Sequence, residues 1–201
     1  MNYEVLISDY ETKAYVNRAN AISVEIESYL GFKTGDVMEF GCKTGLIAFN
    51  LKNKVNELFL VDNSEEMIQA VNHKLKNRQT NITVHSDSIL DSNFKKEFDV
   101  IYISLTLHHI KNVQEFINKL AGFLKKNGKL IIVDFLPDNG ILHNNQDNFE
   151  GHHGFKVEEI SQILETAGLV EVMGRKFYSS YQRFNGSSHP YSLFSCVGQK
   201  Q

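Results

Sequence analysis

A short turn containing two glycines follows the apolar run Val37–Phe40. Gly41 and Gly45 stand four positions apart, and the acid Glu39 lies two positions before the first of them. Glycine permits a positive φ and lets the backbone approach a ligand closely. A strand that ends in such a turn before a helix forms a cofactor-binding edge, although the spacing is not the G-x-G-x-x-G of dinucleotide-binding proteins. The alternative interpretation is a tight strand–helix turn without a ligand.

Acids also end the next two apolar runs. Asp62 follows Leu58–Val61, 17 residues after Gly45, and Asp87 follows Ile82–His85. A carboxylate at the end of the second strand can accept both hydroxyls of a ribose. An isolated acid at a strand end is more often a helix cap, so the interpretation depends on the distance from the glycine turn.

Two pairs of histidines are candidates for a general base. His108 and His109 follow the apolar run Val100–Ile103, and His152 and His153 precede a late helix. A neutral imidazole has a suitable pKa for proton transfer. We take His109 as the first candidate and His153 as the second. The alternative is that these side chains bond to the backbone at a helix entry or in a lid.

A metal site is a weaker interpretation of the same region. His143, His152 and His153 lie near Asp147 and Glu150, and these are suitable ligand types. The segment 138–154 is polar and rich in Asn, which is more typical of a surface loop. We therefore expect no metal.

The elements that must position these residues alternate along the chain. The apolar runs are Val37–Phe40, Leu58–Val61, Ile82–His85, Val100–Ile103, Leu130–Phe135, Leu169–Phe177 and Tyr191–Val197. The helices expected among them are 64–76, with Asn63 and Glu66 at capping-box spacing, 113–124, ended by Asn127-Gly128, and 157–167. This alternation predicts an α/β fold: a Rossmann-like, seven-stranded, mostly parallel sheet with helices on both faces.

The two ends of the chain depart from the alternation. The polar segment 178–190 is too short for a crossover helix, so the last two strands should be antiparallel. The N-terminal stretch 9–31 has a helical period and precedes the first strand. We expect one domain over 1–201, with 1–31 as a helical cover and 138–155 as a lid loop.

Composition narrows the class of protein. The formal net charge of −3 gives no basic field for a nucleic-acid backbone. The longest apolar runs are too short for a membrane helix, and the N-terminus does not have the order of a secretion signal. Two cysteines among 201 residues indicate a reducing, cytoplasmic setting.

Taken in order, these segments resemble class I S-adenosylmethionine-dependent methyltransferases, most closely the small-molecule branch of the ubiquinone/menaquinone-biosynthesis type. The resemblance covers about residues 10 to 198 and rests on Glu39-x-Gly41-x-Lys43-x-Gly45, on the step 123–134, and on the late unit 153–169. Lys43 is the departure, because the family usually has glycine there. A side chain at that position either obstructs the cofactor or, if its φ is negative, points outward or reaches the carboxylate of the methionine part.

The resemblance implies S-adenosylmethionine as the cofactor and assigns roles to particular residues. The implied cofactor-binding positions are Glu39, Gly41, Gly45, Asp62, Asn63, Met67, Asp87, Ser88, Ser104 and Leu105. Among them, Glu39 orders the loop, Asp62 holds the ribose hydroxyls, Met67 touches adenine and Asp87 accepts the adenine amino group. Ser104 and Leu105 line the edge beneath the reacting methyl group.

The implied function is methyl transfer to a small molecule. The segment Ser104-Leu-Thr-Leu lacks the prolines typical of enzymes of this superfamily that methylate nucleic-acid bases. One alternative is a non-catalytic or regulatory relative, which Lys43 motivates. The other is a nicotinamide-dependent oxidoreductase on a similar sheet.

Overall fold

The structure is a computed structural model that describes residues 3–76, 80–87, 94–138, 149–184 and 187–201. Its seven strands follow the hydrogen-bonded order β3-β2-β1-β4-β5-β7-β6. Of the pairings between these strands, those of β7 with β5 and β6 are antiparallel. The predicted fold class is therefore confirmed. Residues up to Tyr102 and residues from Ile103 onward form two compact units.

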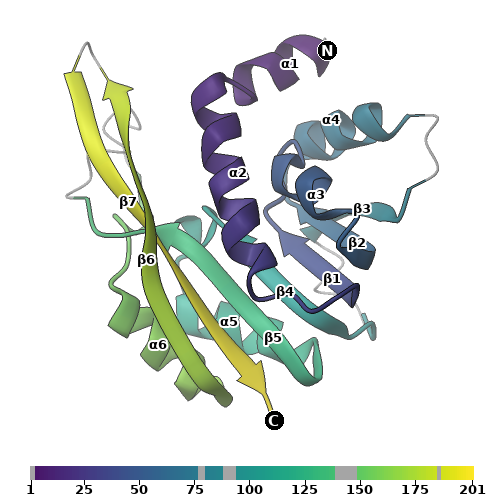
Figure 1. The fold of residues 1–201 in the computed structure, drawn as a ribbon, viewed down its shortest axis with the longest axis vertical. Coiled ribbons are helices and arrows are strands. Elements are labelled where there is room, and N and C mark those ends of the chain that lie inside the picture. The colour runs from purple at the N-terminus through teal and green to yellow at the C-terminus, as the bar shows by residue number, and fades with distance from the viewer. Residues whose placement is uncertain (1–2, 77–79, 88–93, 139–148, 185–186) are drawn as a thin grey trace. The chain divides into compact units, whose positions relative to one another are not determined.

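The first unit contains three parallel strands and the N-terminal helices. Its elements are α1 (Tyr3–Tyr10), α2 (Lys13–Glu27), β1 (Thr34–Phe40), α3 (Leu46–Leu51), β2 (Val55–Asp62), α4 (Glu65–Leu75), β3 (Ile82–Ser86) and most of β4 (Phe98–Ser104). The register pairs Phe40 with Val61 and Asp62 with Ser86. The carboxyl ends of β1, β2 and β3 consequently lie at one edge, as parallel pairing requires. Within this unit α1 packs against α4, and α2 packs against α3 (Figure 1).

Two local predictions in the first unit need correction. The single helix expected over 9–31 is two helices, interrupted at Glu11 and Thr12. The N-cap of α4 is Ser64 rather than Asn63, because the Ser64 hydroxyl accepts a hydrogen bond from the Met67 backbone N–H at 3.4 Å. A serine hydroxyl is as good a cap as an asparagine side chain.

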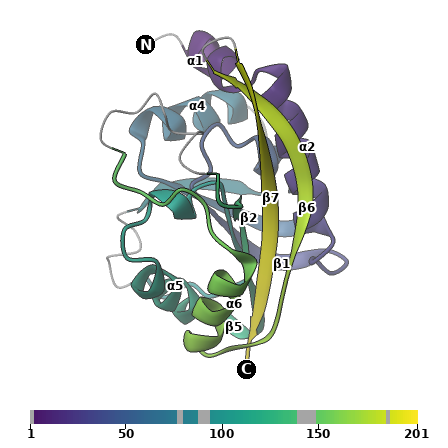
Figure 2. The same cartoon turned by 90° about the vertical axis from the view of Figure 1, so that its left-hand side faces the viewer.

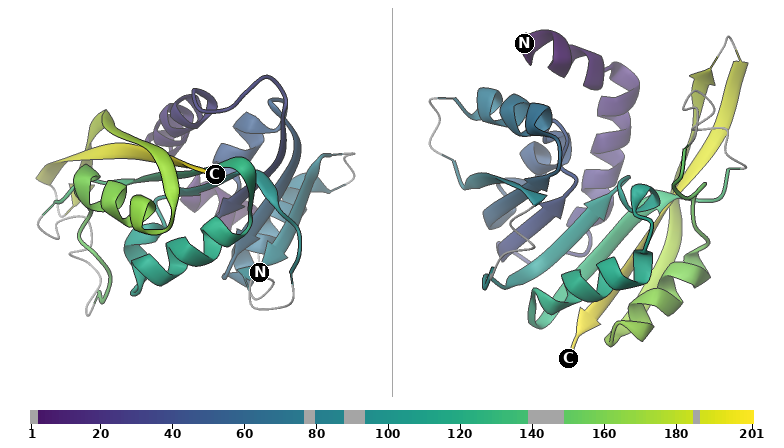
Figure 3. Two further views of the ribbon diagram at one scale, coloured as in Figure 1. Left: turned by 90° about the horizontal axis from the view of Figure 1, so that it is seen from below. Right: turned by 180° about the vertical axis from the view of Figure 1, so that it is seen from behind.

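The second unit is built on antiparallel strands. Its elements are η2 (Leu107–His109), α5 (Val113–Gly122), β5 (Leu124–Phe135), α6 (Val157–Thr166), β6 (Leu169–Phe184) and β7 (Ser187–Lys200). The strands β6 and β7 form one long hairpin (Figure 2), with α6 packed against both of them. In this unit α5 also packs against β5, and α6 lies beside α5 (Figure 3).

The antiparallel arrangement of the last two strands is confirmed, but their lengths were underestimated. The segment 178–190, expected to be a connection, is largely strand: β6 pairs with β7 from Leu169 to Phe184, with two irregularities in register. The helix expected over 113–124 ends at Gly122, and Leu124 already belongs to β5. Among the described residues, no helix is both long and apolar enough to cross a membrane.

Candidate functional site

The glycine turn after β1 has a left-handed backbone at three positions. Gly41 and Gly45 both have φ of 78°, and Lys43 has φ of 48°. A Cβ at Gly45 would lie 3.1 Å from the ring of Phe49, so this position is restricted by space as well as by conformation. The backbone N–H of Gly41 donates to the carbonyl of Val61 at 2.8 Å, which ties the turn to β2. The two glycines are therefore suited to a tight turn that residues with a Cβ adopt less readily.

Asp62 fixes the turn from the end of β2. Its side chain is 4% exposed, and its two carboxylate oxygens accept from the backbone N–H groups of Lys43 at 2.8 Å and Ser64 at 2.9 Å. The same carboxylate thus holds the glycine turn and the start of α4 in place. Each oxygen has a second lone pair, so the group retains capacity to accept from a ligand.

Glu39 is buried beneath the turn. It is 2% exposed, and its carboxyl oxygen accepts a hydrogen bond from the Tyr102 hydroxyl at 3.0 Å. Burial raises the pKa of Glu39 to about 8, against the hydrogen bond from Tyr102, and the negative charge of Asp62 adds to the rise. Glu39 is thus largely protonated at neutral pH. The sequence interpretation did not include Tyr102.

The buried Glu39 carboxyl should make stability depend on pH. Because its pKa is higher in the folded than in the unfolded chain, the folded state holds the extra proton and loses stability as pH rises toward 8. We expect the free energy of unfolding to fall by about 2 kcal/mol between about pH 6 and pH 8. Denaturant unfolding across this range measures the fall, and Glu39→Gln should remove it. A Glu39→Gln variant with the same pH slope would contradict this origin.

Lys43 keeps the backbone conformation of the glycine that it replaces. Its φ is positive, yet its side chain is exposed. The backbone of Lys43 thus does not have the negative φ that we associated with an outward side chain, although the side chain is exposed. Lysine in place of the family's glycine thus strains the backbone at this position, but its exposed side chain does not fill the interior of the turn.

Lys43→Gly is expected to stabilise the chain by a few tenths to about 1 kcal/mol, because the left-handed strain disappears while the unfolded chain gains freedom. Lys33 has a φ of 47° outside the turn, so Lys33→Gly is a matched control for the backbone effect. Denaturant unfolding measures both variants. The dissociation constant for S-adenosylmethionine should change by less than about twofold in each. A large gain in affinity for Lys43→Gly alone would show that the lysine obstructs the cofactor.

The other predicted cofactor residues of the first unit lie around the ends of β2 and β3. Met67 is buried on α4, Asn63 is exposed, and Asp87 is half-buried directly after β3. Ser88 lies outside the described residues. Cys42, in the middle of the turn, is buried, and burial raises the pKa of its thiol, so packing is its role in this structure.

In the second unit, β4 ends in a buried serine and a strained leucine. Ser104 is 5% exposed, and its hydroxyl has no hydrogen-bond partner among the described residues. Leu105 has a φ of 50°, and its backbone N–H donates to the carbonyl of Val133 at 2.9 Å. Unpaired buried polar atoms and left-handed bulky residues are both costly, and they concentrate at functional sites.

A buried histidine–aspartate pair follows Ser104 and Leu105. The Nδ1 atom of His108 lies 2.7 Å from the carboxylate of Asp134, and the backbone N–H groups of His108 and Phe135 donate to the same carboxylate at 3.1 and 2.8 Å. His108 is 3% exposed and Asp134 is 0% exposed. The carboxylate favours the ring tautomer with its proton on Nδ1. The sequence interpretation included His108 but missed Asp134, whose only signal was an acid near the end of a buried strand.

The two predicted catalytic histidines are brought together by one aromatic ring. His109 and His153 are both exposed, and each has its ring 5.5 Å from the ring of Phe149. The ring of His109 also lies 4.1 Å from that of His108. His152 is directed elsewhere, because its Nε2 atom lies 3.0 Å from the carbonyl oxygen of Ile110.

The described residues contain no group of three metal-ligand side chains. Of the metal ligands considered from the sequence, His143 and Asp147 lie outside the described residues. Glu150, a third candidate, forms an exposed ion pair with Lys111.

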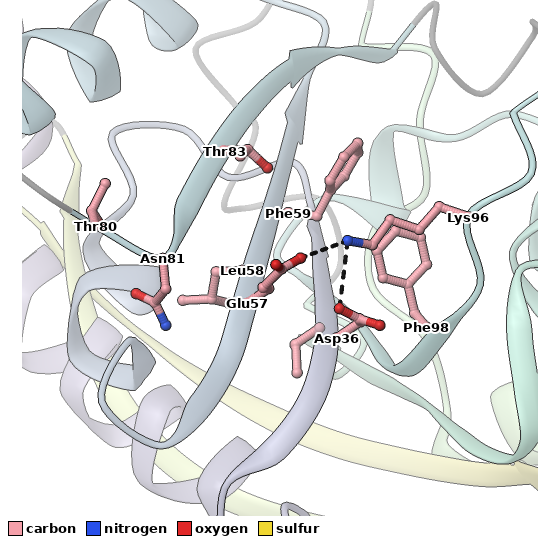
Figure 4. Close-up of a pocket in the computed structure, with 10 residues that line it drawn as sticks. Asp36, Glu57, Leu58, Phe59, Thr80, Asn81, Thr83, Lys96 and Phe98 are labelled. Carbon is pink, nitrogen blue, oxygen red and sulfur yellow. Dashed lines mark hydrogen bonds and ion pairs between the residues drawn. The ribbon is translucent and has the colours of Figure 1, made fainter.

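A separate pocket of about 120 Å³ lies in the first unit (Figure 4). It is lined by the amino-terminal halves of β1 and β2 and by residues 80–83, whereas cofactor sites in parallel sheets lie at the carboxyl ends. The ammonium group of Lys96 lies 2.8 Å from Glu57 and 3.5 Å from Asp36, so the charges that line the pocket are paired. None of the predicted cofactor residues lines it.

Comparisons with known proteins agree with the resemblance in sequence. The family described as "Methyltransferase domain" matches residues 38–132. An uncharacterized methyltransferase of Schizosaccharomyces pombe is 32% identical over 190 residues, which cover 82% of this chain and 66% of the relative. A carboxy-S-adenosyl-L-methionine synthase of Ruthia magnifica is 27% identical over 92% of this chain and 82% of the relative.

The fold is also found among solved structures. A phosphoethanolamine N-methyltransferase of Haemonchus contortus, in complex with phosphomonomethylethanolamine and S-adenosylhomocysteine, has a TM-score of 0.71 at 14% identity. The match covers 100% of this chain and 61% of that protein. At this identity the likeness concerns the fold alone.

Proposed function

We propose that the chain, which belongs to the class I S-adenosylmethionine-dependent methyltransferases, transfers the methyl group of this cofactor to a small-molecule acceptor. The observation that carries the proposal is the buried Asp62 carboxylate holding the glycine turn at the end of β2. The net charge of −3 favours a small molecule over a nucleic acid. The relative from Ruthia magnifica, whose name refers to a small molecule, agrees with this.

The residues fit a positively charged adenosyl cofactor. Glu39 and Asp62 are both buried near the turn, and the charge of Asp62 contributes to the raised pKa of Glu39. A cationic ligand beside these groups is attracted to the Asp62 carboxylate and favours the charged form of Glu39. In the second unit, the buried hydroxyl of Ser104 offers a hydrogen bond that the described residues do not use.

S-Adenosylmethionine would supply a methyl group that is activated by its bond to a positively charged sulfur. In the transfer, the carbon–sulfur bond would break with its electron pair left on sulfur, and a new bond would form between the acceptor and the methyl carbon. An acceptor atom that carries a proton would lose it. In the proposal, Gly41 and Gly45 give the backbone access that the cofactor needs, and Asp62 accepts from the ribose hydroxyls. We also assign Glu39, Asn63, Met67 and Asp87, all in the first unit, to binding of the cofactor.

For the acceptor, we assign roles to residues of the second unit by themselves. His108, with its Nδ1 proton held by Asp134, has its Nε2 lone pair oriented as in a general base. His109 and His153, whose rings both lie beside that of Phe149, remain the exposed candidates. We assign Ser104 and Leu105 to the edge beneath the methyl group. The N-terminal segment 1–31 is proposed as a helical cover. Residues 139–148 of the loop 138–155, which we expected to be a lid, lie outside the described residues. The two free cysteines, Cys42 and Cys196, support a cytoplasmic location.

Two measurements test the proposal. Calorimetric titration should detect binding of S-adenosylhomocysteine and no binding of NADH; the reverse result would support the oxidoreductase. Transfer from methyl-labelled S-adenosylmethionine should then place label in a small-metabolite extract and not in RNA, DNA or protein. Binding without any transfer would support the non-catalytic relative instead.

A further inference from the structure

Lys74 joins three parts of the first unit. It lies on α4, and its side chain is 18% exposed. Its ammonium group donates to the carbonyl oxygen of Thr44 at 2.6 Å and forms an ion pair with the carboxylate of Glu11. It also lies 5.3 Å from the centre of the Phe49 ring, a distance at which a cation is attracted to an aromatic face.

The Thr44 carbonyl belongs to the glycine turn itself. Thr44 is 2% exposed and stands between Lys43 and Gly45, the two left-handed residues at the end of the turn. Phe49 in turn contacts the position of a Cβ at Gly45. The ammonium group of Lys74 therefore contacts the turn in two ways: it donates a hydrogen bond to Thr44, and it lies against the Phe49 ring that packs beside Gly45.

Glu11 belongs to the N-terminal segment. It lies in the break between α1 and α2, and its side chain is 21% exposed. The helix α1 packs against α4, the helix that carries Lys74 (Figure 1). An ion pair shielded from water to this degree is less weakened by solvent than a fully exposed one. Through Lys74, the position of the N-terminal helices is linked to the conformation of the turn.

We propose that Lys74 is a positioning residue that holds the glycine turn ready for the cofactor and couples cofactor binding to docking of α1. The proposal rests on the proposed function, because it needs S-adenosylmethionine to bind at this turn. Coupling of this kind is reciprocal: what fixes α1 strengthens cofactor binding, and bound cofactor holds α1 more firmly.

Two variants separate the two contacts. Lys74→Met removes both, and it should weaken binding of S-adenosylmethionine about tenfold in calorimetry. Glu11→Gln removes only the ion pair and leaves the bond to Thr44, so it should weaken binding less. Lys74→Arg keeps the charge and should restore part of the affinity. Lys76→Met is the matched control, because Lys76 is an exposed lysine at the end of the same helix, and its affinity should equal that of the parent chain.

Hydrogen exchange reads the coupling independently of affinity. S-Adenosylmethionine should slow amide exchange over residues 3–12 in the parent chain and in Lys76→Met, and much less in Glu11→Gln and Lys74→Met. Unchanged affinity of Lys74→Met, or undiminished protection of residues 3–12 in Glu11→Gln, would overturn the inference. If Lys74→Met does not fold, the protection of residues 3–12 in Glu11→Gln tests the inference by itself. A parent chain that fails to bind S-adenosylmethionine would instead refute the proposed function.

Discussion

Replacing Asp62 by alanine is expected to weaken binding of S-adenosylmethionine by about 100-fold, which corresponds to about 2.7 kcal/mol. The ribose hydroxyls lose their proposed acceptor. In addition, the backbone N–H groups of Lys43 and Ser64 lose theirs, and an unsatisfied buried donor costs about 1–3 kcal/mol. Calorimetry gives the dissociation constant, and thermal unfolding gives the part of the effect that belongs to the fold.

Asp99 provides a matched control for this variant. Its carboxylate accepts from the backbone N–H of Asp36 at 2.7 Å, in the same unit but outside the predicted cofactor residues. Asp99→Ala should therefore lower stability without lowering affinity. A cofactor analogue that lacks the ribose 2′-hydroxyl should bind more weakly than S-adenosylmethionine to the parent chain and equally to Asp62→Ala. If both ligands bind the parent chain with the same affinity, Asp62 does not have the assigned role.

The parts of the site that the sequence predicted are those fixed by local patterns. Gly41 and Gly45 have the positive φ that their spacing suggested, and Asp62 lies at a strand end beside them. Both follow from residue type and from distance along the chain. Turn chemistry and strand periodicity are local properties, so they can be recognised in a single sequence without an alignment of homologues.

The residues that the sequence did not predict are partners separated by long stretches of chain. Tyr102 reaches Glu39 across 63 residues, and Lys74 reaches Glu11 across the same number. Asp134 is 26 residues from His108. Each depends on which strands or helices become neighbours, and no local pattern contains that information.

The β6–β7 hairpin was underestimated for a different reason. Beyond Phe177 the strands carry Ser, Gln and Arg, and Tyr181 is 69% exposed. Strand patterns are recognised from buried faces, whereas this part of the hairpin has few buried side chains. Backbone pairing from Leu169 to Phe184 continues where the hydrophobic signal ends.

Replacing Asp134 by asparagine is expected to slow methyl transfer by about 100-fold or more, within the range of a lost general base. The asparagine amide would donate to Nδ1 of His108, which places the ring proton on Nε2 and removes the lone pair from that atom. The volume is nearly unchanged, and the amide oxygen still accepts from the backbone N–H of His108, whereas the backbone N–H of Phe135 loses its acceptor. Affinity for S-adenosylmethionine should therefore change little. The rate is measured as transfer of labelled methyl groups into the small-metabolite extract.

The pH dependence distinguishes a base from a structural pair. General-base catalysis makes the rate of the parent chain depend on pH, and in Asp134→Asn this dependence should disappear, whereas a purely structural role lowers the rate equally at every pH. Nitrogen NMR of the His108 ring should show directly that the proton is on Nδ1 in the parent chain and on Nε2 in Asp134→Asn. His152→Gln is the control, because His152 bonds to the carbonyl of Ile110 and should leave the pH profile unchanged. Retention of the full rate by Asp134→Asn, with the tautomer reversed, would exclude His108 as the base and leave His109 and His153 as the candidates.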